Sequence, residues 1–426
     1  MIIAGSILTE PSHAPEPGWL RVEDGRIVEV REGAPPRDLA PPDIGGGSAN
    51  GGGRFLIVPA FIDAHMHFPQ IDSIGCDGLP LLEWLQEIIF PAEAWWGRGA
   101  ASSMMRTAAR RLLRAGTCGV AGYLTSHDAV NHQALSALAR STPLRFIAGR
   151  VGMDRNAPDE LCAADLERAT MRPLPSVRLA QPDGVDPADA RRRISLNPRF
   201  AISCTEELLA EFGWASRDDR DLYVQTHLCE SVPECAMIRE LFPEDDHYTG
   251  VYDRFGLLHE RTLLAHCVHL TAPEWALIAE RRSIIVHCPA ANIFLESGLF
   301  DLDAAREHDV RLALGSDVAA GSDIAMPRVA RGMIETAKVR RLCGKGGVHI
   351  PSPAEAWTMI TRGNADVLGW HDAGRIEVGA AADLLVLRVP DTWFDEHLVG
   401  RLIYNWSTHL IADRVLNGVR VDPEAW

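Results

Sequence analysis

The chain has 426 residues, 46% of them hydrophobic, which is enough for a large buried core. Its formal net charge of −16 disfavours nucleic acid and anionic membranes as partners, because both attract basic surfaces. The nine cysteines include no CxxC pair, which favours free thiols in a reducing compartment. The N-terminus lacks the basic region of a signal peptide, and no apolar run reaches the roughly 18 residues of a membrane span, so we expect a cytoplasmic protein.

The two ends of the chain share one kind of pattern. Residues 1–58 contain short β-like segments joined by turn residues, and among them the run GGGSANGGG, which we interpret as a surface loop because no lysine or helix start follows it. Residues 372–426 contain similar short strands and tight turns. We therefore expect residues 1–58 and 372–426 to form one small β-sandwich domain beside a larger domain at 59–371.

Between the two ends, eight apolar runs alternate with helix-like stretches. They are FLIVPAFIDAH (55–65), GTCGVAGY (116–123), RFIAGRVGM (145–153), RRISLNPRFAISC (192–204), DLYVQTHL (221–228), TLLAHC (262–267), SIIVHC (283–288) and VRLALGSD (310–317). Apolar runs that end in a polar residue are typical of buried parallel strands. Eight of them alternating with helices predict an α/β fold, a (β/α)8 TIM-type barrel. The proline-rich stretch at 155–194 predicts an irregular excursion after the third strand.

Histidine and acidic residues stand at the ends of several of these strands. His65 and His67 are two residues apart, so in a strand both imidazoles point to the same side and can reach one ion. His227 lies near the end of the fifth run and Asp317 at the end of the eighth, where a buried carboxylate is costly unless it is paired or metal-bound. Because the strand ends of a barrel face one pocket, these four residues predict a metal site. Three imidazoles and a carboxylate suit one Zn²⁺ per chain, with Fe²⁺ as an alternative.

Three further residues at strand ends are candidates for catalysis or support. Glu230 follows His227 by three residues and is expected to carry protons, while Asp317 takes up the proton of a water activated by the metal. His266 ends the sixth run and is either a further ligand or a hydrogen-bond donor to that water. His287 ends the seventh run, where packing or support is the favoured role.

The lysines bear on the number of metal ions. Barrel hydrolases with two metals often use a carboxylated lysine that lies between the first and the eighth strand. The only two lysines of this chain, Lys338 and Lys345, follow Asp317. A single metal ion is therefore favoured, with a bridging glutamate or cysteine as the alternative.

These residues resemble the amidohydrolase superfamily and, within it, the guanine deaminase family. The superfamily motifs are HMH, HLCE, His266 and GSD, and the family motifs include HMHFPQ (65–70), LPLLEWL (79–85), FPAE (90–93), MDRN (153–156), NPRF (197–200) and HCPAANIFLESG (287–298). The resemblance implies hydrolytic deamination of guanine to xanthine and ammonia, and a homodimer. It also implies His65, His67, His227 and Asp317 as ligands, His266 close to the metal or its water, and Glu230 as the proton shuttle.

The same resemblance implies a pocket for a small purine-like molecule. Gln70 offers a donor and an acceptor to a ring edge, Arg199 offers a fork of donors to a purine carbonyl and N7, and Phe200 offers an apolar face. A salt bridge to a neighbouring acid is the structural alternative for Arg199. Leu81 and Trp84 are candidates for the pocket wall, although their helical spacing fits core residues equally well.

Two other interpretations of the function stay open. One is an enzyme of the same fold that acts on a pterin, 8-oxoguanine, isoguanine or a triazine, because prolines interrupt residues 157–194, where loops shape specificity. The other is a catalytically silent scaffold relative, which the complete ligand set disfavours. The HxE and PCxxC motifs of nucleic-acid deaminases do not occur in the sequence, which disfavours editing of nucleic acids.

Overall fold

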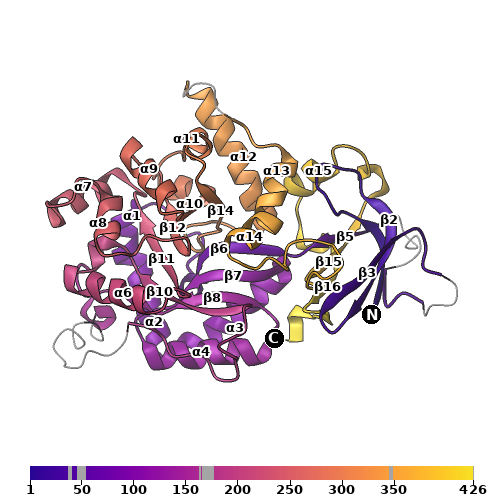
Figure 1. Cartoon of the computed structure of the whole chain (residues 1–426), viewed down its shortest axis with the longest axis horizontal. Coiled ribbons are helices and arrows are strands. Elements are labelled where there is room, and N and C mark those ends of the chain that lie inside the picture. Colours follow the sequence, from indigo (N-terminus) through magenta and orange to yellow (C-terminus); the bar gives the residue numbers. More distant parts are fainter. Residues whose placement is uncertain (37–40, 46–53, 163–164, 166–176, 345–348, 426) are drawn as a thin grey trace.

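The computed structural model describes residues 1–36, 41–45, 54–162, 165, 177–344 and 349–425. Two parts lie side by side, a ring of parallel strands surrounded by helices and a sheet made from both ends of the chain (Figure 1). This arrangement confirms the predicted TIM-type barrel with a small β-structure built from the two termini. Residues 46–53, which belong to the glycine-rich run interpreted as a loop, lie outside the described residues.

The barrel strands follow one another in chain order, and each corresponds to one of the eight predicted runs. They are β6 (Phe61–His67), β7 (Thr117–Tyr123), β8 (Arg145–Gly149), β10 (Arg192–Pro198), β11 (Tyr223–Leu228), β12 (Thr262–His266), β13 (Ile284–His287) and β14 (Arg311–Leu314), while the short β9 (Val151–Gly152) pairs with β10. Each run is longer than the barrel strand that it forms. The first also contains β5 (Arg54–Pro59) of the terminal sheet, because the chain is buried in both sheets in turn.

Helices follow the strands and cover the outside of the barrel (Figure 1). After β6 come α1 (Leu81–Trp84), η2 (Leu85–Ile89), α2 (Phe90–Trp95), η3 (Trp96–Ala100) and α3 (Ala101–Ala115). Further helices are α4 (Asp128–Ser141), α6 (Glu206–Asp218), α7 (Val232–Leu241), α8 (Tyr248–Arg254), α9 (Ala272–Glu280), α10 (Pro289–Phe294), α11 (Leu302–Glu307), α12 (Met326–Leu342), α13 (Pro353–Thr358), η5 (Met359–Gly363), α14 (Asn364–Val367) and α15 (Leu398–Tyr404).

Helix α3 illustrates how the sequence determines such an element. Apolar residues recur on one face and are buried against the strands, among them Met104, Ala108 and Leu112. The helix ends at Gly116, whose φ of 89° is left-handed and therefore costs least at glycine. The next residue begins β7, so the helix and the strand share a sharp boundary.

The first and the last barrel strand are joined by specific polar contacts. The Asn364 side chain donates to the carbonyls of Ile62 (2.7 Å) and Leu314 (2.8 Å) and accepts from the Leu314 amide (2.9 Å). At the carboxyl ends, the Asp317 amide donates to the His65 carbonyl at 2.8 Å. These bonds close the ring and bring the residues after β14 beside the two histidines of β6.

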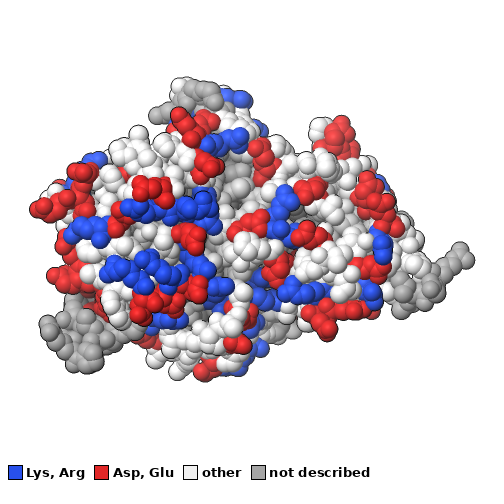
Figure 2. Space-filling model, in the orientation of Figure 1, with Lys and Arg blue, Asp and Glu red and all other residues white. Residues whose placement is uncertain are grey.

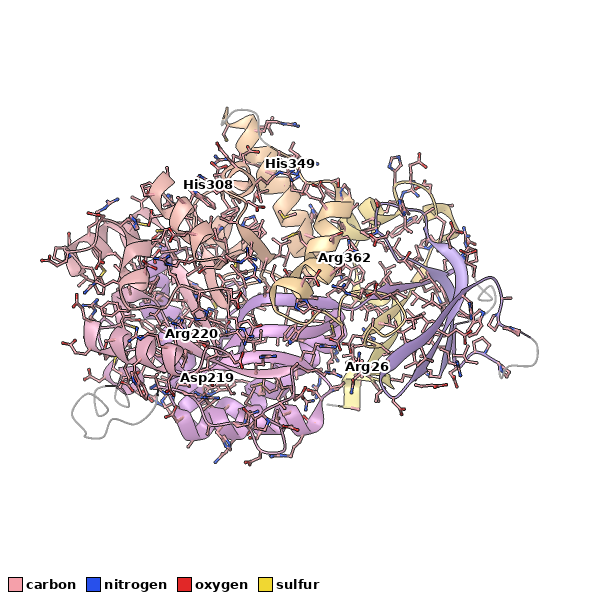
Figure 3. All side chains as sticks on the ribbon, in the orientation of Figure 1. Arg26, Asp219, Arg220, His308, His349 and Arg362 are labelled. Carbon is pink, nitrogen blue, oxygen red and sulfur yellow. The ribbon has the colours of Figure 1, made fainter. Side chains whose placement is uncertain are left out.

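The terminal sheet has eight strands among the described residues, and it has its own core. It contains β1 (Ile2–Ile7), β2 (Glu16–Glu23), β3 (Arg26–Glu32), β4 (Ile44–Gly45), β5, β15 (Leu384–Val389), β16 (Ile411–Leu416) and β17 (Val419–Arg420). Polar pairs fasten this sheet to the barrel. Arg145 of β8 binds Asp372 and Asp383, both at 2.9 Å, and Arg362, which lies near the boundary in Figure 3, binds Glu10 at 2.8 Å.

The surface is charged but mixed in sign. On the face shown in Figure 2, Lys and Arg side chains alternate with Asp and Glu side chains, with no broad basic area among the described residues. None of the described helices is long and apolar enough to cross a membrane. The stretch predicted to be irregular is only partly so: residues 159–162 and 165 are helical, whereas residues 177–191 form turns and bends without a helix or strand.

Candidate active site

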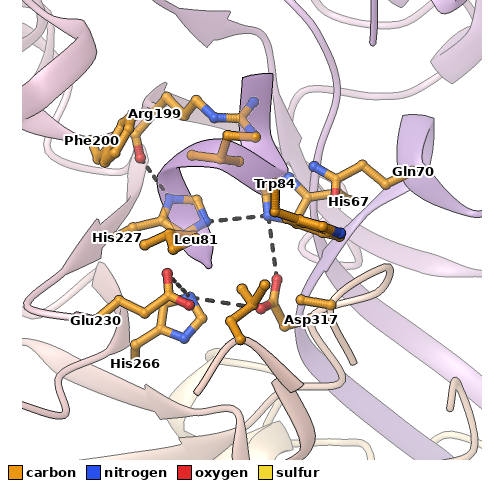
Figure 4. A pocket seen from close by; sticks show the side chains of 13 residues that line it. His67, Gln70, Leu81, Trp84, Arg199, Phe200, His227, Glu230, His266 and Asp317 are labelled. Atoms are coloured by element: carbon orange, nitrogen blue, oxygen red, sulfur yellow. Dashed lines mark hydrogen bonds and ion pairs between the residues drawn. The ribbon is translucent and has the colours of Figure 1, made fainter. Parts of the chain in front are cut away.

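A pocket opens at the carboxyl ends of the barrel strands (Figure 4). Its walls include nearly all the residues that the sequence singles out for metal binding, proton transfer and substrate binding. The lining residues are His67, Gln70, Leu81, Trp84, Leu85, Arg199, Phe200, His227, Glu230, His266, Leu295, Asp317 and Ala320. His65, in the same strand β6 as His67, is grouped with three of these residues.

Four of the strand-end residues form a compact, buried group. One potential ligand atom from each of His65, His67, His227 and Asp317 lies within 4.8 Å of those of the others. The Asp317 carboxylate is 3.2 Å from Nε2 of His65 and 3.5 Å from Nε2 of His67, whose Nε2 is 3.2 Å from Nε2 of His227. Asp317 turns toward the group from a left-handed backbone (φ 48°), a conformation that is often found at functional sites.

The donor set of this group fits a divalent metal ion. His227 Nδ1 faces the Arg199 carbonyl at 2.6 Å, so Nδ1 carries the hydrogen and Nε2 presents its lone pair to the group. Within the described residues, the buried Nε2 of His65 has no hydrogen-bond partner. Burial, with repulsion from neighbouring cationic groups, holds the pKa of His65, His67 and His227 well below the usual range. Neutral imidazoles with free lone pairs are the form that binds metals.

Asp63 holds the backbone beside this group, a role for which the sequence alone gives no signal. Its carboxylate accepts hydrogen bonds from the Ser316 hydroxyl (2.5 Å), the Ser316 amide (2.9 Å) and the His65 amide (3.2 Å). Burial raises the pKa of Asp63 to about 7, while these bonds act in the opposite direction. Asp63 therefore joins β6 to the segment after β14. Together these two segments carry His65, His67 and Asp317, three of the four grouped residues.

Glu230 and His266 lie beside the group of four. Glu230 Oε2 is 3.3 Å from His266 Nε2, which is also 3.7 Å from Asp317 Oδ2. Burial, followed by the charges of Asp317 and Glu234, raises the pKa of Glu230 well above its usual range. A carboxyl with a raised pKa can hold a proton near neutral pH and donate it. His266 Nδ1 faces Asn292 Oδ1 at 2.9 Å, which fixes the ring orientation.

The opposite wall carries Gln70 and Arg199, both buried. The guanidinium of Arg199 forms an ion pair with Glu93, with Nη1 at 2.6 Å from each carboxylate oxygen. The salt bridge considered as a structural alternative is thus present, and Arg199 still lines the pocket. Gln70 donates to the same carboxylate at 3.0 Å. The sequence alone gives no signal for this role of Glu93, although the residue ends the FPAE motif.

The residues of the apolar wall have both of the roles expected for them, as pocket lining and as core. Leu81 and Trp84 line the pocket and also belong to the main core cluster, and Phe200 does the same from the segment after β10. Trp84 is fixed by a hydrogen bond from its indole to the Cys76 carbonyl at 2.7 Å. His287, for which packing was favoured, stacks on Phe300 with ring centres 4.7 Å apart and is not part of the pocket lining.

Comparison with known proteins assigns a class to this site. The amidohydrolase family matches residues 56–413. The chain is 36% identical to the guanine deaminase of Escherichia coli (strain K12) over 334 residues, which cover 78% of this chain and 73% of that protein. Its fold matches a guanine deaminase from C. acetobutylicum with bound guanine, with a TM-score of 0.85 and 26% identity over 99% of both chains. A zinc-bound adenosine deaminase from Xanthomonas campestris matches with a TM-score of 0.79 and 25% identity, over 100% of this chain and 95% of the other.

The chain therefore belongs to the amidohydrolase family, and it is a hydrolase that acts on carbon–nitrogen bonds. Guanine deaminases are among its relatives in both sequence and structure, which confirms the resemblance indicated by the sequence motifs.

Proposed function

We propose that this chain deaminates guanine hydrolytically, producing xanthine and ammonia. The observation that carries the proposal is the arrangement of the pocket. A buried acid with a raised pKa, Glu230, adjoins a four-residue group suited to a metal, and Gln70 and Arg199 face them from the other wall (Figure 4). Relatives that are guanine deaminases support the same substrate.

The group that would hold the metal consists of His65, His67, His227 and Asp317, with His266 adjacent. We expect one Zn²⁺ per chain, because nitrogen-rich sets with one carboxylate are common zinc sites, while Fe²⁺ also fits such ligands. When bound, a divalent ion of this kind lowers the pKa of water to about 7 and so provides a nucleophile at neutral pH.

The protons of the reaction are then carried by two carboxyl groups. Asp317 accepts a proton from the attacking water, and burial raises its pKa to about 6, close enough to neutrality for it to exchange that proton. Glu230 donates its proton to the ring nitrogen beside the carbon that bears the amino group. The water oxygen bonds to that carbon as its proton passes to Asp317. Glu230 then takes up the proton of the added hydroxyl and passes it to the amino nitrogen, so that the C–N bond breaks, ammonia leaves and the oxo group of xanthine remains. The proton held by Asp317 restores the acid form of Glu230.

The wall opposite Glu230 is proposed to recognise the purine. Arg199 presents guanidinium donors to the carbonyl and N7 edge, and Gln70 presents an amide that both donates and accepts. Phe200, Leu81 and Trp84 would enclose the flat ring. A pocket with polar groups fixed in this way discriminates strongly against analogues that leave a buried group unpaired.

Ammonia release by the purified, zinc-loaded protein tests the proposal. Guanine is compared with 8-oxoguanine, isoguanine, adenine, cytosine and a pterin. Glu230→Gln, which keeps the shape of the side chain but removes its acid, is expected to lower kcat by about 10²–10⁴-fold with zinc content unchanged. Removal of zinc with a chelator should abolish turnover, and added zinc should restore it.

The substrate assignment would be contradicted if guanine were not deaminated while a pterin or another purine was. It would equally be contradicted if Glu230→Gln kept wild-type kcat. The homodimer and the cytoplasmic location expected from the sequence remain predictions, and sedimentation of the purified chain measures the first of them directly.

A further inference from the structure

Glu93 on α2 lies behind the pocket, where it contacts the two polar residues of the recognition wall. Its side chain is fully buried and is not among the residues that line the cavity. It accepts hydrogen bonds from Gln70 Nε2 (3.0 Å) and from Arg199 Nη1 (2.6 Å to each oxygen). One carboxylate therefore serves two residues from different strand ends.

For Gln70, these contacts fix the orientation of the side-chain amide, that is, the positions of its nitrogen and its oxygen. A carboxylate can only accept, so the nitrogen must face Glu93, and the amide oxygen accepts from the Ala319 amide at 3.3 Å. A rotated amide would put oxygen against oxygen and N–H against N–H. One N–H and one lone pair of the amide remain for a ligand. Glu93 and Ala319 together determine on which side each of them lies.

For Arg199, α2 supplies both a charge partner and a stacking surface. Phe90 and Glu93 are three residues apart on the helix and so share a face. The guanidinium lies over the Phe90 ring at 5.3 Å while Nη1 is held by Glu93, which leaves Nη2 and Nε as the donors free of Glu93. The position and the plane of the fork are thus both determined by this helix.

The pair also sets the charge of the recognition wall. Arg199 is balanced by a buried carboxylate at hydrogen-bond distance, so the wall offers directed donors without a net positive charge. Such a wall suits a neutral ring that carries acceptors. It gives no special stabilisation to an anionic ring.

We propose that Glu93 is a positioning and specificity-determining residue that orients Gln70 and Arg199 for a neutral oxopurine and disfavours anionic purines. The inference rests on the proposed guanine deamination. It concerns a residue that touches neither the substrate nor the metal ligands and acts only through the two residues that it holds.

The test compares the wild type with Glu93→Gln and Glu93→Asp in the zinc-loaded protein. For Glu93→Gln, kcat/KM for guanine should fall at least tenfold, mostly through KM, because the lost interactions serve binding more than the chemical step. Glu93→Asp keeps the charge on a shorter side chain, so its kcat/KM for guanine should lie between the values of the wild type and Glu93→Gln. Inhibition by urate, an anion at neutral pH, should become at least fivefold stronger in Glu93→Gln, because Arg199 is then unbalanced.

Asp383→Asn is the matched control, since Asp383 is also a buried carboxylate paired with an arginine but lies at the other end of the barrel. It should lower the thermal midpoint without moving KM or urate inhibition. A purely structural Glu93 would behave in the same way, which would overturn the inference. If Glu93→Gln does not fold, unchanged kinetics of Glu93→Asp overturn it instead. If the wild type does not deaminate guanine, the proposed function and this inference are both wrong.

Discussion

Asp63 is a buried residue whose hydrogen bonds all go to the frame of the proposed metal site. It accepts from the amides of His65 and Ser316 and from the Ser316 hydroxyl. In Asp63→Asn, the Ser316 hydroxyl can still accept from the new NH₂ group, but the amides of His65 and Ser316 then share one neutral amide oxygen in place of a carboxylate oxygen, which weakens their hold on the backbone at His65. Loss of such a supporting partner typically lowers metal affinity 10–100-fold, and we expect a change of about that size.

Zinc competition with a chelator of known affinity measures the effect of Asp63→Asn. Asp383→Asn serves again as the control, because it removes a buried carboxylate outside the pocket. Wild-type zinc affinity in Asp63→Asn would mean that the frame holds its ligands without this carboxylate.

Among the elements, helix α7 begins directly beside the proposed acid. Ser231 caps the helix, and Glu234 accepts from the amides of Glu230 (2.7 Å) and Ser231 (3.1 Å) in a capping box. The cap therefore also holds the backbone of Glu230. Ser231→Ala should destabilise the protein by about 1 kcal/mol and, because small misplacements of catalytic groups are costly, lower kcat by roughly tenfold.

Helix α13 offers a matched control for that prediction. It begins with the same kind of capping box, formed by Ser352 and Glu355, and it has a proline in its first turn as α7 does. Ser352→Ala should cost a similar free energy of unfolding, measured by urea titration, and leave kcat unchanged. Equal kcat values for the two variants would show that the α7 cap does not position Glu230.

The elements also show what the sequence can and cannot reveal. Buried parallel strands are continuous apolar runs, and for this reason all eight were recognisable, together with the polar residues at their ends. The partners of buried polar groups have no such signal. Glu93 meets Arg199 across 106 positions, and Asp63 meets Ser316 across 253, so only the closed fold identifies these pairs.

At the scale of the whole molecule, the barrel and the terminal sheet are joined by a buried ion pair. Arg145 at the start of β8 binds Asp383, just before β15, and the two side chains are 2% and 1% exposed. Arg145 also binds Asp372, which precedes the same strand. Arg145 belongs to the barrel, and both aspartates lie in the segment that leads into the terminal sheet. These contacts can therefore form only when both parts are folded and assembled.

Replacement of Arg145 by leucine should therefore destabilise the molecule strongly without changing its chemistry. The variant leaves the Asp383 carboxylate buried with the more distant Arg191, at 3.8 Å, as its remaining cation, and breaking a buried pair of this kind costs about 3–5 kcal/mol. Equilibrium urea unfolding measures the loss, while KM for guanine in the folded variant should stay at the wild-type value. Adding Asp383→Asn to Arg145→Leu removes this poorly compensated charge and keeps an acceptor for the Asn417 amide. The double variant should then recover part of the lost stability. A double variant less stable than Arg145→Leu would show that Asp383 stabilises the joint without its arginine.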